Sequence, residues 1–226
     1  PFYGRGMSEV LLGVALKGVP RDSYQLCTKL GRYDLAHFDF SAKRVAESVD
    51  VSLHRLRTDH LDIILCHDIE FVPMQQIVDE TIPALRKIQK SGKVRFIGVS
   101  GSLPQLPEQV DMGIWDAFQI PYSALQREHE AAIAKASAAG AGIIIRGGVS
   151  RGMPSDFENR RYYMQPGTLP KDRWEGASLD ELLNGMSRME FSLRFTLSNP
   201  DLDTTIVGTS NPDHLLGNLT AAAKGP

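Results

Sequence analysis

The residues best suited to chemistry follow short β-branched runs, where predicted strands end. In a parallel α/β sheet or barrel the active site lies at the carboxyl ends of the strands. Amine, imidazole, hydroxyl and phenol groups placed there can exchange protons with a substrate or hydrogen-bond to it. The candidates are Lys29, His67 with Asp68, Ser100 with Gly101, Gln119 with Tyr122, Arg146, the run from Gly208 to Asn211, and Tyr3 in the opening loop.

The histidines do not form a metal-binding pattern. Only His67 ends a predicted strand, and the others, His37, His54, His60, His129 and His214, lie in predicted loops or helices. A metal hydrolase needs several His and carboxylate ligands gathered at strand ends. We therefore expect no metal site.

The elements that must position these residues alternate between strands of about five residues and helices of ten or more, as in βα units. The predicted strands are Tyr24–Thr28, Leu61–Cys66, Val94–Val99, Ala117–Ile120, Gly142–Ile145 and Thr204–Val207. The predicted helices are Ser8–Leu16, Ala42–Leu56, Met74–Ser91, Glu128–Ala139, Leu179–Leu197 and Pro212–Ala223. Ser41 and Asn211 are placed to cap two of these helices.

Six parallel βα units are compatible with an open doubly wound sheet or with most of a (β/α)8 barrel. An open nucleotide-binding sheet favours a G-x-G-x-x-G turn after its first strand. The nearest string starts at Gly4 but has Glu9 in place of the third glycine and follows no predicted strand. That fingerprint is therefore absent, and periodicity alone leaves the two architectures open.

Composition and charge exclude several classes of protein. Hydrophobic residues make up 42% and charged residues 23% of the 226 residues, which is typical of a globular protein with a core. Twenty-five basic against 27 acidic residues give a formal charge of −2, so we expect no nucleic acid or anionic membrane as a partner. Two cysteines in apolar runs and the lack of a signal peptide predict a cytoplasmic location.

The segment 147–177 differs from the rest of the chain because it is rich in Gly, Pro, Arg and Tyr and has no clear period. A loop of this length in a compact domain is usually a lid or a binding loop. We predict a lid or substrate loop at 147–177.

Five motifs in sequence carry a resemblance to a known family: YGRGMSE, CTKLG, LDIILCHD, KVRFIGVSG and IVGTSNPDHLLGNL. In this order they resemble the aldo-keto reductases, from Tyr3 to Asn218, and the middle of the chain looks most like the L-galactose and related aldose dehydrogenase branch. The resemblance implies one (β/α)8 TIM-barrel domain over residues 1–226. It further implies that the first two strands, the catalytic Asp a few residues before Tyr3 and the C-terminal tail fall outside this sequence.

The resemblance also implies roles for three residues. Tyr3 matches the proton donor to a carbonyl oxygen, or the acceptor from an alcohol, and His67 matches the group that orients that oxygen. Lys29 matches the lysine beside the tyrosine. A phenol with a pKa near 10 is a poor acid at neutral pH, and an adjacent ammonium lowers that pKa by favouring the phenolate.

For the cofactor, NADP or NAD, the resemblance places Ser100 and Gln119 on the nicotinamide carboxamide and Arg146 against the ring. Gly101 departs from the usual Asn. The matching phosphate and adenine residues are Gly208, Thr209, Ser210, His214 and Asn218. Ser210 and His214 stand where many members carry Arg, so no guanidinium is available for a 2′-phosphate, and NAD is as plausible as NADP.

The function implied is an NAD(P)-dependent oxidoreductase that interconverts a carbonyl and an alcohol, or an aldose and its lactone, in the cytoplasm with a small-molecule substrate. Two alternatives remain, a catalytically silent subunit that binds nicotinamide nucleotide, and an inactive fragment. Because Tyr3, Lys29 and His67 occur together, the enzyme is favoured. The sequence does not indicate the oligomeric state.

Overall fold

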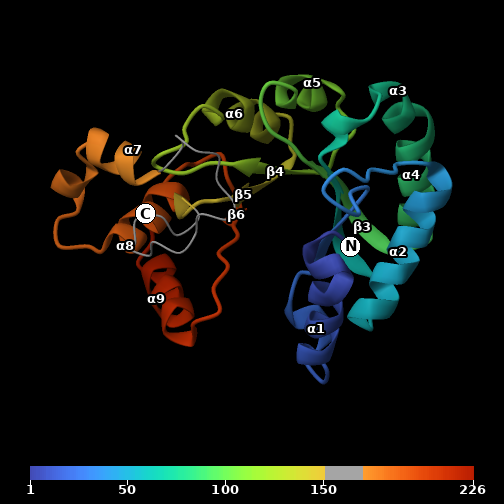
Figure 1. Ribbon diagram of the computed structural model, residues 1–226, viewed down its shortest axis with the longest axis horizontal. Helices are drawn as coiled ribbons and strands as arrows, with labels where there is room; N and C mark the ends of the chain where they lie inside the picture. The colour runs from blue at the N-terminus through green and yellow to red at the C-terminus, as the bar shows by residue number, and fades with distance from the viewer. Residues whose placement is uncertain (151–169) are drawn as a thin grey trace. The chain divides into compact units, whose positions relative to one another are not determined.

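The computed structural model describes residues 1–150 and 170–226. These residues form two compact units, Pro1–Gln119 and Ile120–Pro226, which are described one at a time (Figure 1). Six strands follow one another in the order β1-β2-β3-β4-β5-β6, and the pairs β1–β2, β2–β3, β3–β4 and β5–β6 are parallel. The predicted parallel α/β class is confirmed.

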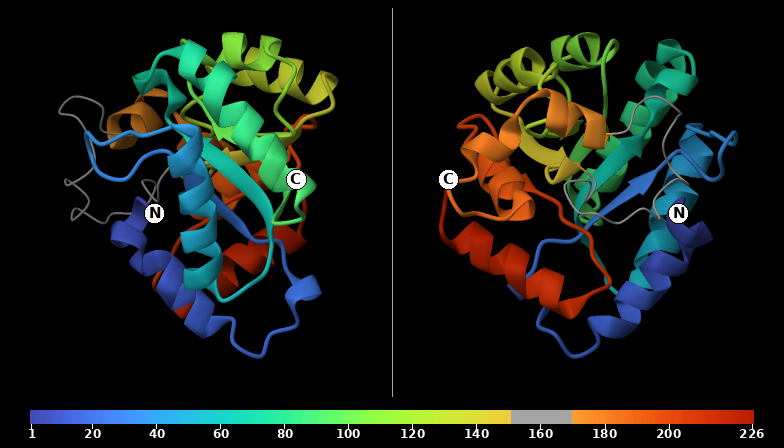
Figure 2. Two further views of the ribbon diagram at one scale, coloured as in Figure 1. Left: turned by 90° about the vertical axis from the view of Figure 1, so that its right-hand side faces the viewer. Right: turned by 60° about the vertical axis from the view of Figure 1, so that its left-hand side comes forward.

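The first unit contains three complete strands and the start of a fourth. They are β1 (Cys27–Leu30), β2 (Leu61–His67), β3 (Val94–Ser100) and β4 (Ala117–Pro121), and the longer helices are α1 (Met7–Ala15), α2 (Ala42–Leu56) and α4 (Ile82–Lys90). Short helical turns lie at Tyr3–Gly6, Arg21–Ser23, Ile69–Phe71, Met74–Gln76 (α3), Ile77–Thr81 and Leu106–Asp111 (α5). Helices α2 and α4 pack on the strands, and α1 packs against α2 (Figure 2).

The register of the first unit brings the strand ends together. Leu30 pairs with Cys66, His67 with Ser100, and Ser100 with Gln119. The apolar side chains of α2 that recur every three or four residues, Val45, Val49, Leu53 and Leu56, are buried as predicted. Ser41 caps this helix, because its hydroxyl oxygen accepts a hydrogen bond from the Arg44 amide at 3.3 Å.

The second unit contains the end of β4, β5 (Gly142–Arg146) and β6 (Thr204–Thr205). Its helices are α6 (Glu130–Ala138), α7 (Pro170–Gly176), α8 (Arg188–Leu197) and α9 (Pro212–Ala223), with a 3-10 turn at Leu179–Leu182. Val149, Leu193 and Ala221 form a small buried cluster that joins α8 to α9. The predicted cap of α9 is confirmed, because the Asn211 side chain accepts from the Asp213 amide at 2.9 Å.

Three predicted elements are wrong in detail. The helix predicted over Leu179–Leu197 is a short turn followed by α8, because Asn184 and Gly185 have φ of 45° and 83° and interrupt it. The first strand begins at Cys27 instead of Tyr24. The last strand stops at Thr205 instead of Val207, and among the described residues it pairs with β5.

The predicted lid at 147–177 is only partly within the described residues, because 151–169 lie outside them. Within the described part, Pro170–Gly176 forms α7, which the lack of periodicity did not predict. The role of 147–177 as a lid or substrate loop stays a prediction. No helix in residues 1–150 or 170–226 is long and apolar enough to cross a membrane.

Candidate active site

A tyrosine and a lysine meet in the first unit at the carboxyl end of β1. The Lys29 ammonium donates a hydrogen bond to the Tyr3 phenol oxygen over 3.1 Å and lies 5.4 Å from the centre of its ring. Lys29 is 8% exposed and Tyr3 is 50% exposed. The pair therefore joins a buried cation to a phenol that solvent or a small molecule can reach, which is an arrangement that can transfer a proton.

Local backbone geometry holds Tyr3 at this position. Gly4, Arg5 and Gly6 have φ of 57°, 53° and 91°, so three left-handed residues turn the chain between Tyr3 and α1. At Gly6 a Cβ atom would meet only the end of the flexible Arg55 side chain, so it is the left-handed backbone conformation that favours glycine there.

His67 is the last residue of β2 and is buried beside the tyrosine. Its ring centre lies 5.6 Å from that of Tyr3, and the Phe2 ring packs edge-on against both, at 5.5 Å from each. The Asp68 carboxylate lies 3.6 Å from His67 Nε2 and forms an ion pair with Arg32. The imidazole is thus placed by packing and by a neighbouring carboxylate, and it can hydrogen-bond to an oxygen beside the phenol.

Ser100 and Gln119 extend this group along the next two strands. Lys29 Nζ lies 3.4 Å from Ser100 Oγ, and the Ser100 hydroxyl donates to Gln119 Oε1 at 3.3 Å. Both side chains are buried. A serine hydroxyl and a side-chain amide offer the donors and acceptors that suit a carboxamide.

Gly101 is closely packed, which accounts for the absence of a longer side chain there. A Cβ atom at this position would lie 2.2 Å from the amide oxygen of the fully buried Gln109. The carboxamide contact that the family resemblance assigns to an Asn therefore has no side chain at this position.

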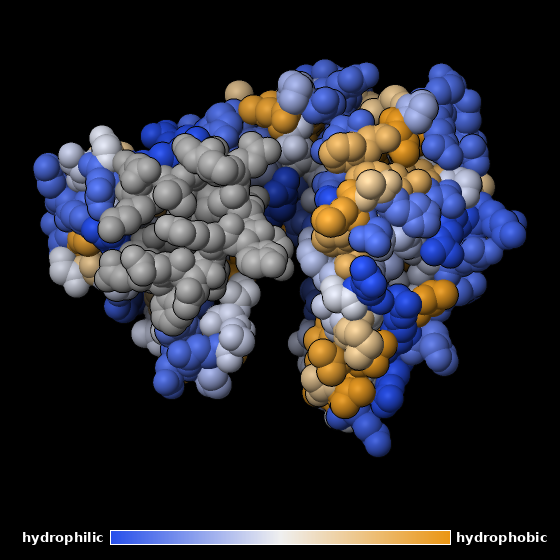
Figure 3. All heavy atoms as spheres, viewed as in Figure 1, coloured by the Kyte–Doolittle hydropathy of each residue, from blue (hydrophilic) through white to orange (hydrophobic). Residues whose placement is uncertain are grey.

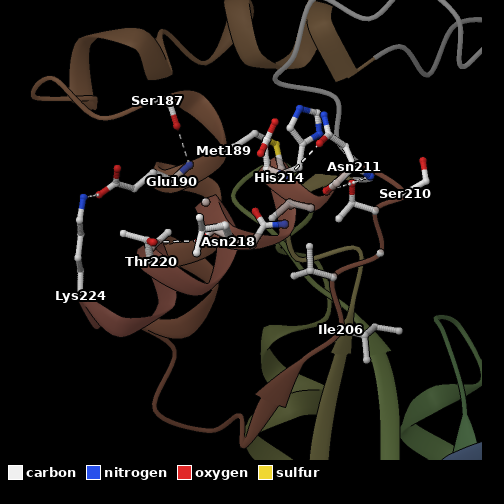
Figure 4. A pocket seen from close by; sticks show the side chains of 18 of the residues that line it. Ser187, Met189, Glu190, Ile206, Ser210, Asn211, His214, Asn218, Thr220 and Lys224 are labelled. Atoms are coloured by element: carbon white, nitrogen blue, oxygen red, sulfur yellow. Dashed lines mark hydrogen bonds and ion pairs between the residues drawn. The ribbon is translucent and has the colours of Figure 1, made fainter. Parts of the chain in front are cut away.

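The second unit contains a separate cavity of about 1260 Å³ (Figure 4). Five predicted cofactor residues line it: Gly208, Thr209, Ser210, His214 and Asn218. Arg146 ends β5, one residue before Gly147, which also lines the cavity. Predicted cofactor residues are thus brought together within each unit, Ser100 with Gln119 in the first and the Gly208–Asn218 group in the second.

The start of α9 gives this cavity its chemistry. In the first turn of α9, Pro212 has no amide hydrogen and the Asp213 amide donates to Asn211, while the His214 amide and the helix dipole still favour an anion at this end. Asn211 Nδ2 and the Thr209 and Ser210 hydroxyls add further donors beside them. This donor set fits the phosphates of a dinucleotide.

The cavity also holds an ion pair that the sequence did not indicate. Lys224 Nζ, at the end of α9, lies 2.7 Å from Glu190 Oε1 on α8, and Arg194 lies 3.6 Å from the same oxygen. These cations hold the pKa of the Glu190 carboxyl below its usual range, with the Lys224 hydrogen bond as the main cause. Among the described residues that line the cavity none is an arginine, so a 2′-phosphate finds no guanidinium there.

Sequence analysis missed Phe2, Arg32 and Glu9 in the first unit, and Glu190 and Lys224 in the second. Arg32 follows the strand-end candidate Lys29 by three positions and could have been found from that position. The partners of Glu9 and Lys224 are more than 15 positions away in the chain, at separations of 19 and 34. No local pattern predicts such contacts.

Comparisons with known proteins identify the family of this chain. The model of the aldo/keto reductase family matches residues 1–225. L-galactose dehydrogenase of Arabidopsis thaliana is 34% identical over 99% of this chain and 72% of its own length. D-threo-aldose 1-dehydrogenase of a Pseudomonas species is 26% identical over 99% of this chain and 77% of its own.

A solved structure gives the same result for the fold. The holo form of the aldo-keto reductase AKR11C1 from Bacillus halodurans superposes with a TM-score of 0.83 and 27% identity, over 99% of this chain and 75% of that one. The strand order and this likeness are consistent with part of a (β/α)8 barrel. The family model matches nearly the whole chain, and the chain covers 72% of a relative to which it is 34% identical. The chain therefore belongs to the aldo/keto reductase family.

Proposed function

We propose that this protein interconverts an aldose and its lactone, or a small aldehyde and its alcohol, with Tyr3 as the proton donor and acceptor. Family membership makes it an NAD(P)-dependent oxidoreductase. The aldose substrate class is supported by the similarity to two aldose dehydrogenases. The observation that carries the proposal is the 3.1 Å contact between Lys29 and Tyr3 beside His67.

In the proposed mechanism, a substrate oxygen lies against the Tyr3 hydroxyl and the His67 imidazole. In reduction, Tyr3 Oη gives its proton to the carbonyl oxygen, and in oxidation the phenolate takes the proton of the substrate hydroxyl. Lys29 stabilises the phenolate by its positive charge at 3.1 Å. His67 hydrogen-bonds to the same oxygen and orients it, which lowers the entropy cost of the reaction.

The nicotinamide supplies or accepts the hydride when it is bound. Ser100 and Gln119 are the residues that would hold its carboxamide, and Arg146 the residue that would stack on the ring. Residues Gly208 to Asn211 and the first turn of α9 would hold the phosphates, and Asn218 the adenine.

The remaining parts of the proposal concern location and partners. Cys27 and Cys66 are both free thiols, which fits a reducing compartment, and we place the protein in the cytoplasm. The partner is a small carbonyl compound or sugar. The formal charge of −2 argues against nucleic acid as a partner.

The proposal is tested by assaying the 226-residue chain at 340 nm with NAD and NADP against a panel of aldoses and small aldehydes. L-galactose is included because of the Arabidopsis relative. Tyr24→Phe is the matched control for Tyr3→Phe, because Tyr24 lies against Arg21 and away from Lys29. Turnover that is lost in Tyr3→Phe and kept in Tyr24→Phe supports the proposal, whereas cofactor binding without turnover in the wild-type chain supports a silent binding subunit or an inactive fragment.

A further inference from the structure

Glu9 on α1 is a buried carboxylate that contacts two other elements of the first unit, β1 and α2. It is 7% exposed. Its Oε1 atom accepts from the hydroxyls of Thr28 on β1, at 2.7 Å, and Ser52 on α2, at 2.8 Å. Its Oε2 atom lies 3.3 Å from an Arg55 guanidinium nitrogen.

The contacts of Glu9 connect to both residues of the proposed proton-transfer pair, Lys29 and Tyr3. Thr28 immediately precedes Lys29 on β1. Glu9 sits in the first turn of α1, which Tyr3 precedes through the left-handed turn Gly4–Gly6. A bond between Glu9 and Thr28 therefore ties the helix that follows the phenol to the strand that carries the ammonium.

No apolar side chain of α1 is fully buried among the described residues, and Val10 is half-buried. Met7, Leu11, Leu12 and Val14 are 40–63% exposed, and apolar atoms cover the outside of this helix (Figure 3). The buried residues of α1 are Glu9 and Gly13. At Gly13 the helix approaches α2 so closely that a Cβ atom would lie 2.3 Å from the Arg55 carbonyl oxygen. Glu9 thus supplies directional contacts from α1 to both β1 and α2.

We infer that Glu9 is a positioning residue for catalysis, which keeps Tyr3 within hydrogen-bonding distance of Lys29 through Thr28, Ser52 and Arg55. This inference rests on the proposed role of Tyr3. A shift of about 1 Å in a reacting group can cost about a hundredfold in rate, so an anchor of this kind has a measurable effect.

The test compares Glu9→Ala, Glu9→Gln and Thr28→Val in the 226-residue chain, with Asp50→Asn as the control. Asp50 is an exposed carboxylate on α2 that forms an ion pair with Lys93 at 2.6 Å. The control therefore removes a charge from α2, the helix that carries Ser52 and Arg55, and leaves the Glu9 contacts in place. Two quantities are measured on folded protein: the kinetic constants, and the pH midpoint of the Tyr3 resonance in ¹³Cζ-tyrosine-labelled samples, assigned with Tyr3→Phe.

We expect Glu9→Ala to lower kcat about tenfold or more, with the cofactor Kd changed by less than about twofold. The Tyr3 midpoint should move toward the value of about 10 of a free phenol. Glu9→Gln should keep kcat and the Tyr3 midpoint close to their wild-type values, because its amide oxygen still accepts from Thr28 and Ser52. A loss of stability alone would lower the melting temperature and leave the midpoint in place.

Wild-type kcat and an unmoved Tyr3 midpoint in folded Glu9→Ala would overturn the inference. If that variant does not fold, Thr28→Val provides the test, because it removes one hydrogen bond to Glu9 with little change in volume. An unmoved Tyr3 midpoint in Thr28→Val would also overturn the inference. Full turnover in Tyr3→Phe would instead overturn the proposed function, while the midpoint comparison still reports whether Glu9 positions the phenol.

Discussion

The ammonium of Lys29 lies 3.1 Å from the phenol oxygen of Tyr3, 26 positions earlier in the chain. The two residues come from a strand end and from the turn before a helix, and neither has a local sequence pattern that requires the other. Their contact depends on how α1 packs beside β1, so it is a property of the tertiary structure. The predictions below follow from it and from the packing around it.

Replacing the phenol should separate chemistry from binding. Tyr3→Phe removes only the hydroxyl, so we expect turnover to fall by about 10²–10⁴-fold while the Kd of the cofactor stays nearly the same. Stopped-flow absorbance at 340 nm measures the first quantity and fluorescence titration the second. Wild-type turnover in Tyr3→Phe would show that another group supplies the proton.

Discrimination between NAD and NADP should be modest. The cavity of the second unit offers His214 and an already paired Lys224, so we expect the two Kd values to differ by less than about a hundredfold, or about 2.7 kcal/mol. His214→Arg should tighten NADP by about tenfold, since a guanidinium binds a phosphate through two hydrogen bonds. His60→Arg, in the first unit, is the control, and a preference for NADP above a hundredfold in the wild type would contradict this account.

Asp62 should make the protein more stable above pH 4 than below it. Burial opposes ionisation of this carboxyl, but hydrogen bonds from the Leu26 amide and from Arg21 and Arg95 outweigh burial and lower its pKa. A lowered pKa gives stability that is present above the unfolded value of about 3.9 and is lost as the pH falls toward the folded value.

Asp62→Asn tests this dependence. The substitution should lower the free energy of unfolding by roughly 2 kcal/mol at neutral pH, and this difference, the gap from the wild type, should become smaller below about pH 4. Thermal unfolding from pH 3 to 7 measures the gap. A gap that stays constant over this range would show that the ionised carboxylate contributes nothing.

Gly13 should resist substitution although it lies inside a helix. Alanine has the higher helix propensity by about 1 kcal/mol, but its Cβ atom would meet the Arg55 carbonyl oxygen, so we expect Gly13→Ala to destabilise by about 1–3 kcal/mol. Gly217→Ala in α9 is the matched control, because nothing lies within 4 Å of its added Cβ atom. Urea unfolding of both variants distinguishes the effect of packing from that of propensity, and a stabilised Gly13→Ala would show that α1 can shift.

Local pattern predicted those elements whose determinants are local. The helix Ala42–Leu56 begins and ends at the predicted residues, because the Ser41 cap and the spacing of its apolar side chains lie within the helix itself. Strands β2 to β5 were located to within one residue at each end, since buried parallel strands are short apolar runs. The predicted helix Leu179–Leu197 failed where the left-handed backbone at Asn184 and Gly185 outweighed the apolar spacing.

For the candidate site, the amino-acid sequence alone determined which side chains stand at strand ends, because the alternation of strand and helix places all carboxyl ends of a parallel sheet along one edge. His67, Ser100 and Gln119 were predicted in this way, and the register aligns them. Only the tertiary structure decided that Glu9 joins α1 to β1 and that Lys224 pairs with Glu190. Such contacts link residues 19 and 34 positions apart. The buried Glu9 carboxylate needs hydrogen-bond donors in place of water, and Lys224 reaches Glu190 because α9 packs on α8, so both contacts depend on packing and not on neighbours in the sequence.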